Sequence, residues 1–310
     1  MKPLNFAQFK QISINILNGI SIGVITTLVP GAILNNLMKL FTQYSWSQSV
    51  LLFTTIATTL LPAVSALCVG MISQFTPIQT ASLALATVVG AGNIKVTSNG
   101  LAIGGTGDVI NVGITILIAY LLIISLDNRL KSYTILLMPS LVLLIAGGIG
   151  HLTLTPISQI TLIINSVITQ FMQLQPYLMG ALLGASFALI MISPISAVGI
   201  ATAVGVSGIA SGSAGLGIVA TAFALAVYGF KVNSFGTAIA LILGSPKIQL
   251  ANILKKPKII LPIAINAAIM GALGPLFNIQ GTPVSGGFGF IGAVGPITAL
   301  EYSTSWLVVV

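Results

Sequence analysis

Charge is what this chain most clearly lacks. Only 5% of its 310 residues are charged and 56% are hydrophobic, whereas an ordinary soluble domain carries about 25% charged residues. Eleven basic and three acidic side chains cannot cover the surface of a soluble globule of this length, so a soluble enzyme is excluded. Backbone polar groups in lipid must be satisfied within the chain itself. The composition therefore predicts an all-α polytopic membrane protein.

Acids, histidine and cysteine are also scarce. A metal site needs several ligands at close spacing, and one histidine with three scattered acids does not supply them. Cys68 is the single cysteine, so it has no partner for a disulfide or a CxxC pair. No HExxH, GxSxG or Ser/His/Asp pattern is present. The sequence predicts no metal, no cofactor and no catalytic residue.

The net charge of +8 raises the question of nucleic acid as a partner. Nucleic-acid binding needs clustered basic residues with interleaved aromatics, but here the basic residues are scattered between apolar runs. That placement is typical of cytoplasmic loops in membrane proteins, and it predicts a cytoplasmic N-terminus. The two strongest polar loops, 127–131 and 246–258, then fall on the cytoplasmic side with Arg129, Lys131 and the lysines from Lys247 to Lys258. No nucleic-acid partner is predicted.

Apolar runs are long and numerous. Since a helix needs roughly 20 apolar residues to cross a bilayer, we expect about ten to twelve membrane segments. A polar break at 151–156 separates the runs into approximate halves, 1–150 and 151–310, of one transmembrane domain spanning 1–310. The last run starts near Ile297 and is still apolar at Val310, so the C-terminal span is expected to be incomplete.

Two glycine-rich regions, Gly90–Gly107 and Asn278–Pro296, are too polar for lipid-facing helices. They are either ordinary extramembrane loops or re-entrant elements, and their mixture of glycine and apolar residues favours the second. Shifting the chain by 185 residues aligns 77–107 with 262–292 and makes seven of the 31 positions identical, which suggests an internal repeat that includes both regions. Paired interrupted segments are typical of a transporter's binding site. We therefore expect both regions to converge on one cavity.

Hydrogen-bonding side chains within these regions suit a small, neutral, polyhydroxylated ligand, although they could instead satisfy the loop backbone. They are Asn93, Thr97, Asn99, Asn278, Gln280 and Thr282. Asp108 opens the next apolar run and is either a helix cap or a ligand contact, because intramembrane carboxylates are costly without a partner. Glu301 is a similar candidate, with an interfacial carboxylate as the alternative. His151, the only histidine, is either a hydrogen-bonded structural residue or a ligand contact.

Three segments together resemble a known family: GAGNIKVTSNGLAIGGTGDVINVG, SPISAVGIATAVGVSGIASGSAGLGI and NIQGTPVSGGFGFIGAVGPITALE. Over nearly the whole chain they resemble the EIIC membrane subunit of the bacterial phosphotransferase system, and most closely its perfringolysin O regulator-like branch. The resemblance implies a dimeric, sugar-translocating subunit of the bacterial cell membrane. It also implies a glutamate and a histidine at the sugar. Glu301 and His151 are the matching residue types, in surroundings that differ from the family's GITEP-like sequence.

The resemblance further implies cytoplasmic EIIA and EIIB partners, which pass phosphate from a phosphohistidine to the incoming sugar. No EIIA or EIIB sequence is present here, so sugar phosphorylation would require separate proteins. Two other functions stay open. The chain could be an EIIC-derived membrane sensor that binds a ligand without phosphotransfer, or an ion-coupled secondary transporter that uses Asp108.

Overall fold

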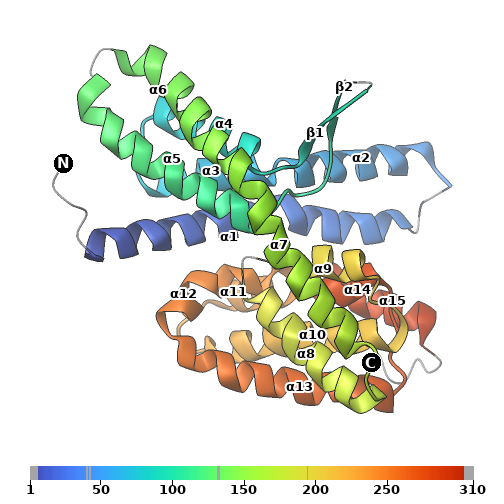
Figure 1. Ribbon diagram of the computed structural model, residues 1–310. Coiled ribbons are helices and arrows are strands. Elements are labelled where there is room, and N and C mark those ends of the chain that lie inside the picture. Colours follow the sequence, from blue (N-terminus) through green and yellow to red (C-terminus); the bar gives the residue numbers. More distant parts are fainter. Residues whose placement is uncertain are drawn as a thin grey trace. The chain divides into compact units, whose positions relative to one another are not determined.

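The computed structural model describes residues 6–303, except 40, 42, 99, 131, 132 and 194. This part of the chain is helical apart from one two-stranded hairpin, which confirms the predicted all-α fold (Figure 1). The chain divides into two compact units, unit 1 with residues 1–31 and 51–159, and unit 2 with residues 32–50 and 160–310. Three helices belong in part to each unit: α1 (Phe6–Lys39), α2 (Ser45–Thr59) and α7 (Gly148–Phe171).

Several helices are apolar enough to cross a membrane. Among the described residues, five are long enough to do so alone: Ala7–Leu28, Val109–Asp127, Thr134–Phe171, Gly208–Tyr228 and Pro257–Leu276. Helix α2 and α3 (Leu61–Ile72) form a sixth candidate with a bend of 53° between them, which fits a broken span or a re-entrant element. Shorter apolar helices cover Pro77–Gly90, Pro176–Met191 and Phe235–Gly244. The sequence-based number of about ten to twelve segments included such shorter runs.

Unit 1 is built on close contacts between apolar helices. Besides parts of α1, α2 and α7 it contains α3, α4 (Pro77–Gly90), β1 (Ile94–Thr97), β2 (Gly100–Ile103), α5 (Val109–Leu130), α6 (Thr134–Val142) and the π-turn η2 (Leu143–Gly147). A Cβ on Gly19 of α1 would lie 2.3 Å from Val69 Cγ2 of α3, and one on Gly23 would lie 2.2 Å from Ser65 Oγ. Small residues at such crossings allow membrane helices to approach closely.

The polar stretch 151–156, expected to separate two spans, lies inside α7. Helices α6 and α7 are joined through η2, and Thr134–Phe171 forms one apolar segment of 38 residues. Pro156 sits within α7, and proline is tolerated in membrane helices where neighbouring groups and local adjustments satisfy the freed backbone groups. The polar residues therefore do not break the helix.

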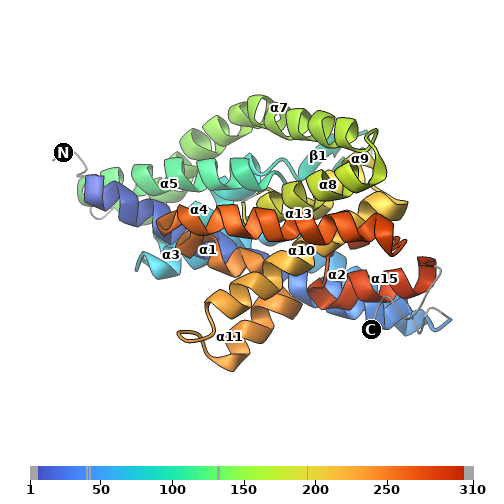
Figure 2. The same cartoon turned by 90° about the horizontal axis from the view of Figure 1, so that it is seen from below.

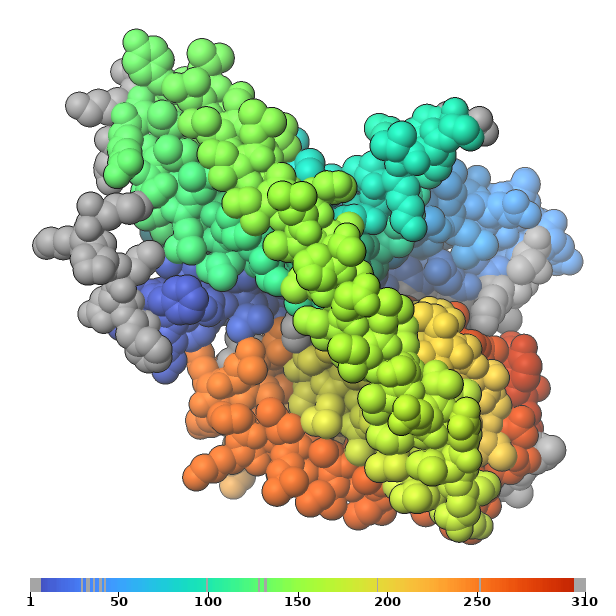
Figure 3. Space-filling model, in the orientation of Figure 1, coloured from blue at the N-terminus to red at the C-terminus, as the bar shows by residue number. Residues whose placement is uncertain are grey.

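The two glycine-rich regions adopt different local structures. In the first, β1 and β2 pair as an antiparallel hairpin in which Ile94 lies opposite Ile103 and Val96 opposite Leu101. The hairpin projects from unit 1 with its side chains exposed (Figure 3). In the second, the helix α14 (Pro283–Phe288) begins at a Thr282 capping box. Whether either region enters the membrane stays a prediction.

Unit 2 is centred on three helices that lie side by side, α8 (Pro176–Met191), α10 (Gly208–Tyr228) and α13 (Ile260–Leu276) (Figure 2). Their backbones are in contact through glycines. A Cβ on Gly217 would lie 2.2 Å from the Gly184 carbonyl oxygen, and one on Gly271 would lie 2.3 Å from the Gly180 carbonyl oxygen. Glycine is the residue that permits such distances between helix axes.

Shorter elements surround this trio. They are α9 (Ala197–Val204), α11 (Phe235–Ile239), η3 (Ala240–Gly244), η4 (Pro246–Gln249), α12 (Leu250–Lys255), η5 (Pro257–Ile259), α14, η6 (Ile291–Ala293) and α15 (Val294–Tyr302). Helix α9 begins at the Ser196 cap and ends at Gly205, whose φ of 75° is left-handed. The apolar run 195–210 is therefore interrupted instead of forming one span. Helix α15 ends at Tyr302, and the apolar residues 304–310 lie outside the described residues.

Candidate functional site

Asp108 caps a helix in unit 1. Its Oδ1 accepts hydrogen bonds from the backbone nitrogens of Ile110 and Asn111, each over 3.0 Å. Its own backbone nitrogen donates to the Ala91 carbonyl over 2.9 Å, which ties the start of α5 to the end of α4. Such a carboxylate satisfies the orphan amides of the first helical turn. A ligand contact at Asp108 is compatible with this cap and stays a prediction.

The other predicted residues of unit 1 have varied surroundings. Asn93 is buried; its Nδ2 donates to the Thr59 carbonyl over 2.8 Å, while its Oδ1 has no hydrogen-bond partner among the described residues. Thr97 is exposed in the hairpin and donates to the Gly100 carbonyl over 2.8 Å. His151 is exposed on α7. Asn99 lies outside the described residues.

Asn111, which the sequence analysis missed, joins three elements of unit 1. It is fully buried, and its Nδ2 donates to the carbonyls of Gly90 over 2.5 Å and of Gly150 over 2.7 Å. Its Oδ1 accepts from Thr153 Oγ1 over 2.8 Å. The ends of α4 and the starts of α5 and α7 thus meet at one amide. Asn111, like Asp108, is a polar residue within an apolar run. That pattern could have identified it from the sequence.

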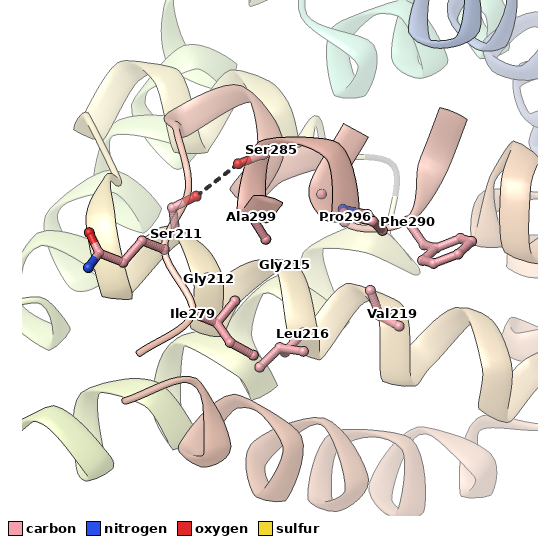
Figure 4. A pocket seen from close by; sticks show the side chains of 13 residues that line it. Ser211, Gly212, Gly215, Leu216, Val219, Ile279, Ser285, Phe290, Pro296 and Ala299 are labelled. Carbon is pink, nitrogen blue, oxygen red and sulfur yellow. Dashed lines mark hydrogen bonds between the residues drawn. The ribbon is translucent and has the colours of Figure 1, made fainter. Parts of the chain in front are cut away.

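Unit 2 contains a partly enclosed cavity of about 160 Å³ (Figure 4). Four stretches of chain form it: the first half of α10, the strand-like segment before α14, the end of α14 and the start of α15. The lining residues are Ser211, Gly212, Gly215, Leu216, Val219, Ile279, Gln280, Ser285, Gly289, Phe290, Gly295, Pro296 and Ala299. Two of the three segments quoted for the family resemblance are therefore brought together here.

Two buried hydroxyls form a polar wall in this cavity. Ser211 Oγ and Ser285 Oγ lie 3.4 Å apart, and the hydrogen bond between them is drawn in Figure 4. Both can donate to the same acceptor, the Thr282 carbonyl, over 2.5 Å from Ser211 and 3.0 Å from Ser285. A hydroxyl oxygen has two acceptor lone pairs; Ser285 Oγ uses one for the Thr282 backbone nitrogen over 2.9 Å, which leaves the other, together with Ser211 Oγ, to accept from a ligand.

Close contacts between the backbone of α10 and that of the segment before α14 hold the two hydroxyls in position. Gly208 and Gly281 exchange two backbone hydrogen bonds, of 2.8 and 3.1 Å, which hold the start of α10 against the segment before α14. A Cβ on Gly212 would lie 2.0 Å from the Ile279 carbonyl oxygen. At Gly215, by contrast, the nearest atom to a Cβ would be 3.5 Å away. Helix α10 therefore contacts the segment before α14 at Gly212 and faces the cavity at Gly215.

The predicted residues of unit 2 lie around this cavity to different extents. Gln280 lines it, and its Nε2 donates to Asn278 Oδ1 over 3.1 Å. Thr282 caps α14, with its backbone nitrogen bound to Ser285 Oγ over 2.9 Å. Glu301 is exposed on α15 and is absent from the lining. Ser211 and Ser285 were not predicted, because serines among glycines carried no distinct signal.

The cavity is electrically neutral. None of its lining residues is charged, and no group of three or more potential metal ligands occurs among the described residues. A neutral wall of hydroxyl, amide and apolar groups suits an uncharged ligand, since an isolated ion without a partner is costly to bury.

Comparison with known protein families identifies the family of the chain. A family model described as "Phosphotransferase system, EIIC" matches residues 14–310. No curated protein and no solved structure matches the chain.

Proposed function

Because the chain belongs to the EIIC family of the phosphotransferase system, we propose that the cavity of unit 2 is where it binds its sugar. Membership makes it a multi-pass membrane protein and a sugar-transport subunit that cooperates with EIIB and EIIA partners. The observation that carries the proposal is the pair Ser211 and Ser285, two buried hydroxyls facing one another in an uncharged cavity.

The size and chemistry of the cavity favour a single neutral sugar ring. Pockets for drug-sized ligands measure about 300–1,000 Å³, and this one is smaller, at about 160 Å³. Ser211 and Ser285 accept hydrogen bonds from sugar hydroxyls, Gln280 adds a carboxamide, and Phe290 offers an apolar face. We include in this proposal contacts with the sugar from the other residues that the sequence singles out. They are Asn93, Thr97, Asn99, Asp108, His151, Asn278, Thr282 and Glu301.

The wider organisation is proposed from the family. We expect one EIIC-like domain over 1–310, a homodimer, and insertion in a bacterial cell membrane with the N-terminus in the cytoplasm. Sensing without phosphotransfer and ion-coupled transport are the competing functions. They are separated by uptake in vesicles: a phosphotransferase subunit requires EIIB and a phosphoryl donor, whereas an ion-coupled transporter requires an ion gradient.

A glycine substitution tests the cavity directly. Gly215→Leu fills the cavity from α10, where the first carbon of the side chain meets no atom nearer than 3.5 Å. Gly236→Leu, on α11, is the matched control, because its nearest atom is 3.9 Å away and it lies outside the lining. In purified protein, calorimetric titration with a panel of neutral monosaccharides should show binding to the wild type and to Gly236→Leu. Equal binding to Gly215→Leu would disprove this location.

A further inference from the structure

Lys247 differs from the other lysines of the 246–258 segment. Lys255, Lys256 and Lys258 are exposed, as a cytoplasmic loop would require, but Lys247 is buried with 8% of its surface exposed. Its predicted place on the cytoplasmic side stays a prediction, but its side chain is not solvated as those of the other three are. The residue belongs to η4, outside the helices that qualify as membrane spans.

Three backbone carbonyls accept hydrogen bonds from the Lys247 ammonium. Its Nζ donates to the carbonyl oxygens of Ser193 over 2.5 Å, of Ile195 over 2.7 Å and of Ile190 over 3.4 Å. An ammonium has three N–H donors, and each has an acceptor here. The acceptors belong to the last turn of α8 and to the connection that leads to α9. Cations are favourable at the C-terminal end of a helix, where carbonyls lack partners.

Among the described residues, the hydrogen-bond acceptors of Lys247 Nζ are backbone carbonyls. The acid of unit 2, Glu301, is exposed on α15. The elements around Lys247 carry few titratable groups. Tyr177 on α8 and Tyr228 on α10 are each more than half exposed, Lys255 on α12 is exposed, and α9 and η3 have none.

The connection that Lys247 holds leads to the cavity. Ile195 precedes Ser196, whose Oγ accepts from the Gly199 nitrogen over 3.0 Å and starts α9. Helix α9 touches α14 backbone to backbone, because a Cβ on Gly287 would lie 2.4 Å from Val198 Cα. Helix α14 in turn carries Ser285, one of the two hydroxyls of the cavity. A displacement of α9 must therefore shift the polar wall.

We propose that Lys247 is a positioning residue for the cavity: its ammonium fixes the α8–α9 connection and thereby sets α9 and α14 in the geometry that binds the sugar. The proposal rests on the function proposed above for the cavity. It assigns the buried lysine a role in ligand affinity, without contact with the ligand.

Protonation of Lys247 gives this arrangement a measurable signature. Burial lowers the pKa of Lys247 from 10.5 to about 7. A neutral amine has two N–H donors, so one of the three carbonyls loses its donor when the pH rises above that value. Sugar affinity should then fall as the pH rises, with a midpoint near 7.

The test compares three variants by sugar titration at several pH values. Lys247→Met should weaken binding roughly tenfold, equivalent to about 1.4 kcal/mol, and should abolish the pH midpoint. Lys247→Arg stays protonated throughout this range, so it should bind without the midpoint and more tightly than Lys247→Met. Lys255→Met, which removes an exposed lysine, is the control and should behave like the wild type. Wild-type affinity that is independent of pH, or unchanged affinity in Lys247→Met, would overturn the proposal.

A second readout needs no sugar. In a background with Cys68→Ala, the variant Ile195→Cys places a thiol on the α8–α9 connection. Adding Lys247→Met should raise its rate of maleimide labelling at a fixed pH about tenfold, because the connection is released. An unchanged rate would refute the positioning role even if no tested sugar binds. Failure of every sugar to bind, with labelling accelerated, would instead count against the cavity as the sugar site and support the role of Lys247 in holding α9.

Discussion

Two glycines on α10 allow the effect of backbone packing on stability to be measured apart from the effect of helix propensity. Gly217→Ala places a methyl group 2.2 Å from the Gly184 carbonyl oxygen, a backbone atom that cannot rotate away. Gly215→Ala, two residues earlier, places the same methyl group toward the cavity with 3.5 Å to its nearest atom. Alanine stabilises a helix interior by about 1 kcal/mol relative to glycine, and this gain is common to both variants.

The difference in stability between the two variants is therefore the packing effect alone. Overpacking costs about 1–3 kcal/mol, so Gly217→Ala should unfold at a clearly lower temperature than Gly215→Ala. Thermal melting of the purified proteins in detergent, followed by circular dichroism, measures this. Gly148→Ala, where a Cβ meets no atom within 4 Å, serves as a second control. Equal melting temperatures for Gly217→Ala and Gly215→Ala would refute the backbone contact between α8 and α10.

Three further predictions follow from other parts of the chain. Since the folded-state pKa of Lys247 is lowered from 10.5 to about 7, the folded protein binds fewer protons than the unfolded one between these values, so stability should rise with pH across this window; Lys247→Met should remove that part of the pH dependence of melting. Asp108→Ala should lower stability by about 1 kcal/mol through loss of the α5 cap, whereas Asp108→Asn should retain most of it; equal melting of the two variants would contradict capping. In a Cys68→Ala background, a cysteine at the exposed positions Val96 or Val284 should be labelled by a membrane-impermeant reagent from only one side of the membrane, because neither glycine-rich region is expected to cross it; labelling from both sides of one position would be contrary to this expectation.

The class of fold could be predicted because it depends on composition. With 5% charged residues and apolar runs of about 20 residues, the sequence indicates membrane-spanning helices, and the structure and the family match bear this out. The local structure of the two glycine-rich regions was harder to predict. Ser98, Asn99 and Gly100 are residue types that favour turns, and Thr282-Pro283 followed by Ser285 is typical of a helix start, yet the shared composition of the two regions concealed this difference.

The candidate site was predictable in part. Gln280 and Thr282 were singled out because amides and hydroxyls in a glycine-rich segment suit a neutral ligand, and both lie at the cavity or next to it. Ser211 could not be found in this way, because its role depends on the approach of a carbonyl 71 residues away in the chain. The burial of Lys247 could not be predicted for the same reason: the carbonyls that accept its hydrogen bonds come from the end of α8 and the residues after it, more than 50 residues earlier in the chain.

The glycine contacts among α8, α10 and α13 decide which parts of the cavity can move. A contact between two backbones contains no side chain that can change rotamer, so these three helices can shift only as one rigid frame. The short helices α9 and α14 are different, because each ends at a left-handed glycine, Gly205 and Gly289, where the chain direction can change. Ser211 belongs to the frame and Ser285 to the jointed part. The 3.4 Å between their two oxygens therefore reports how closely α14 is held against α10.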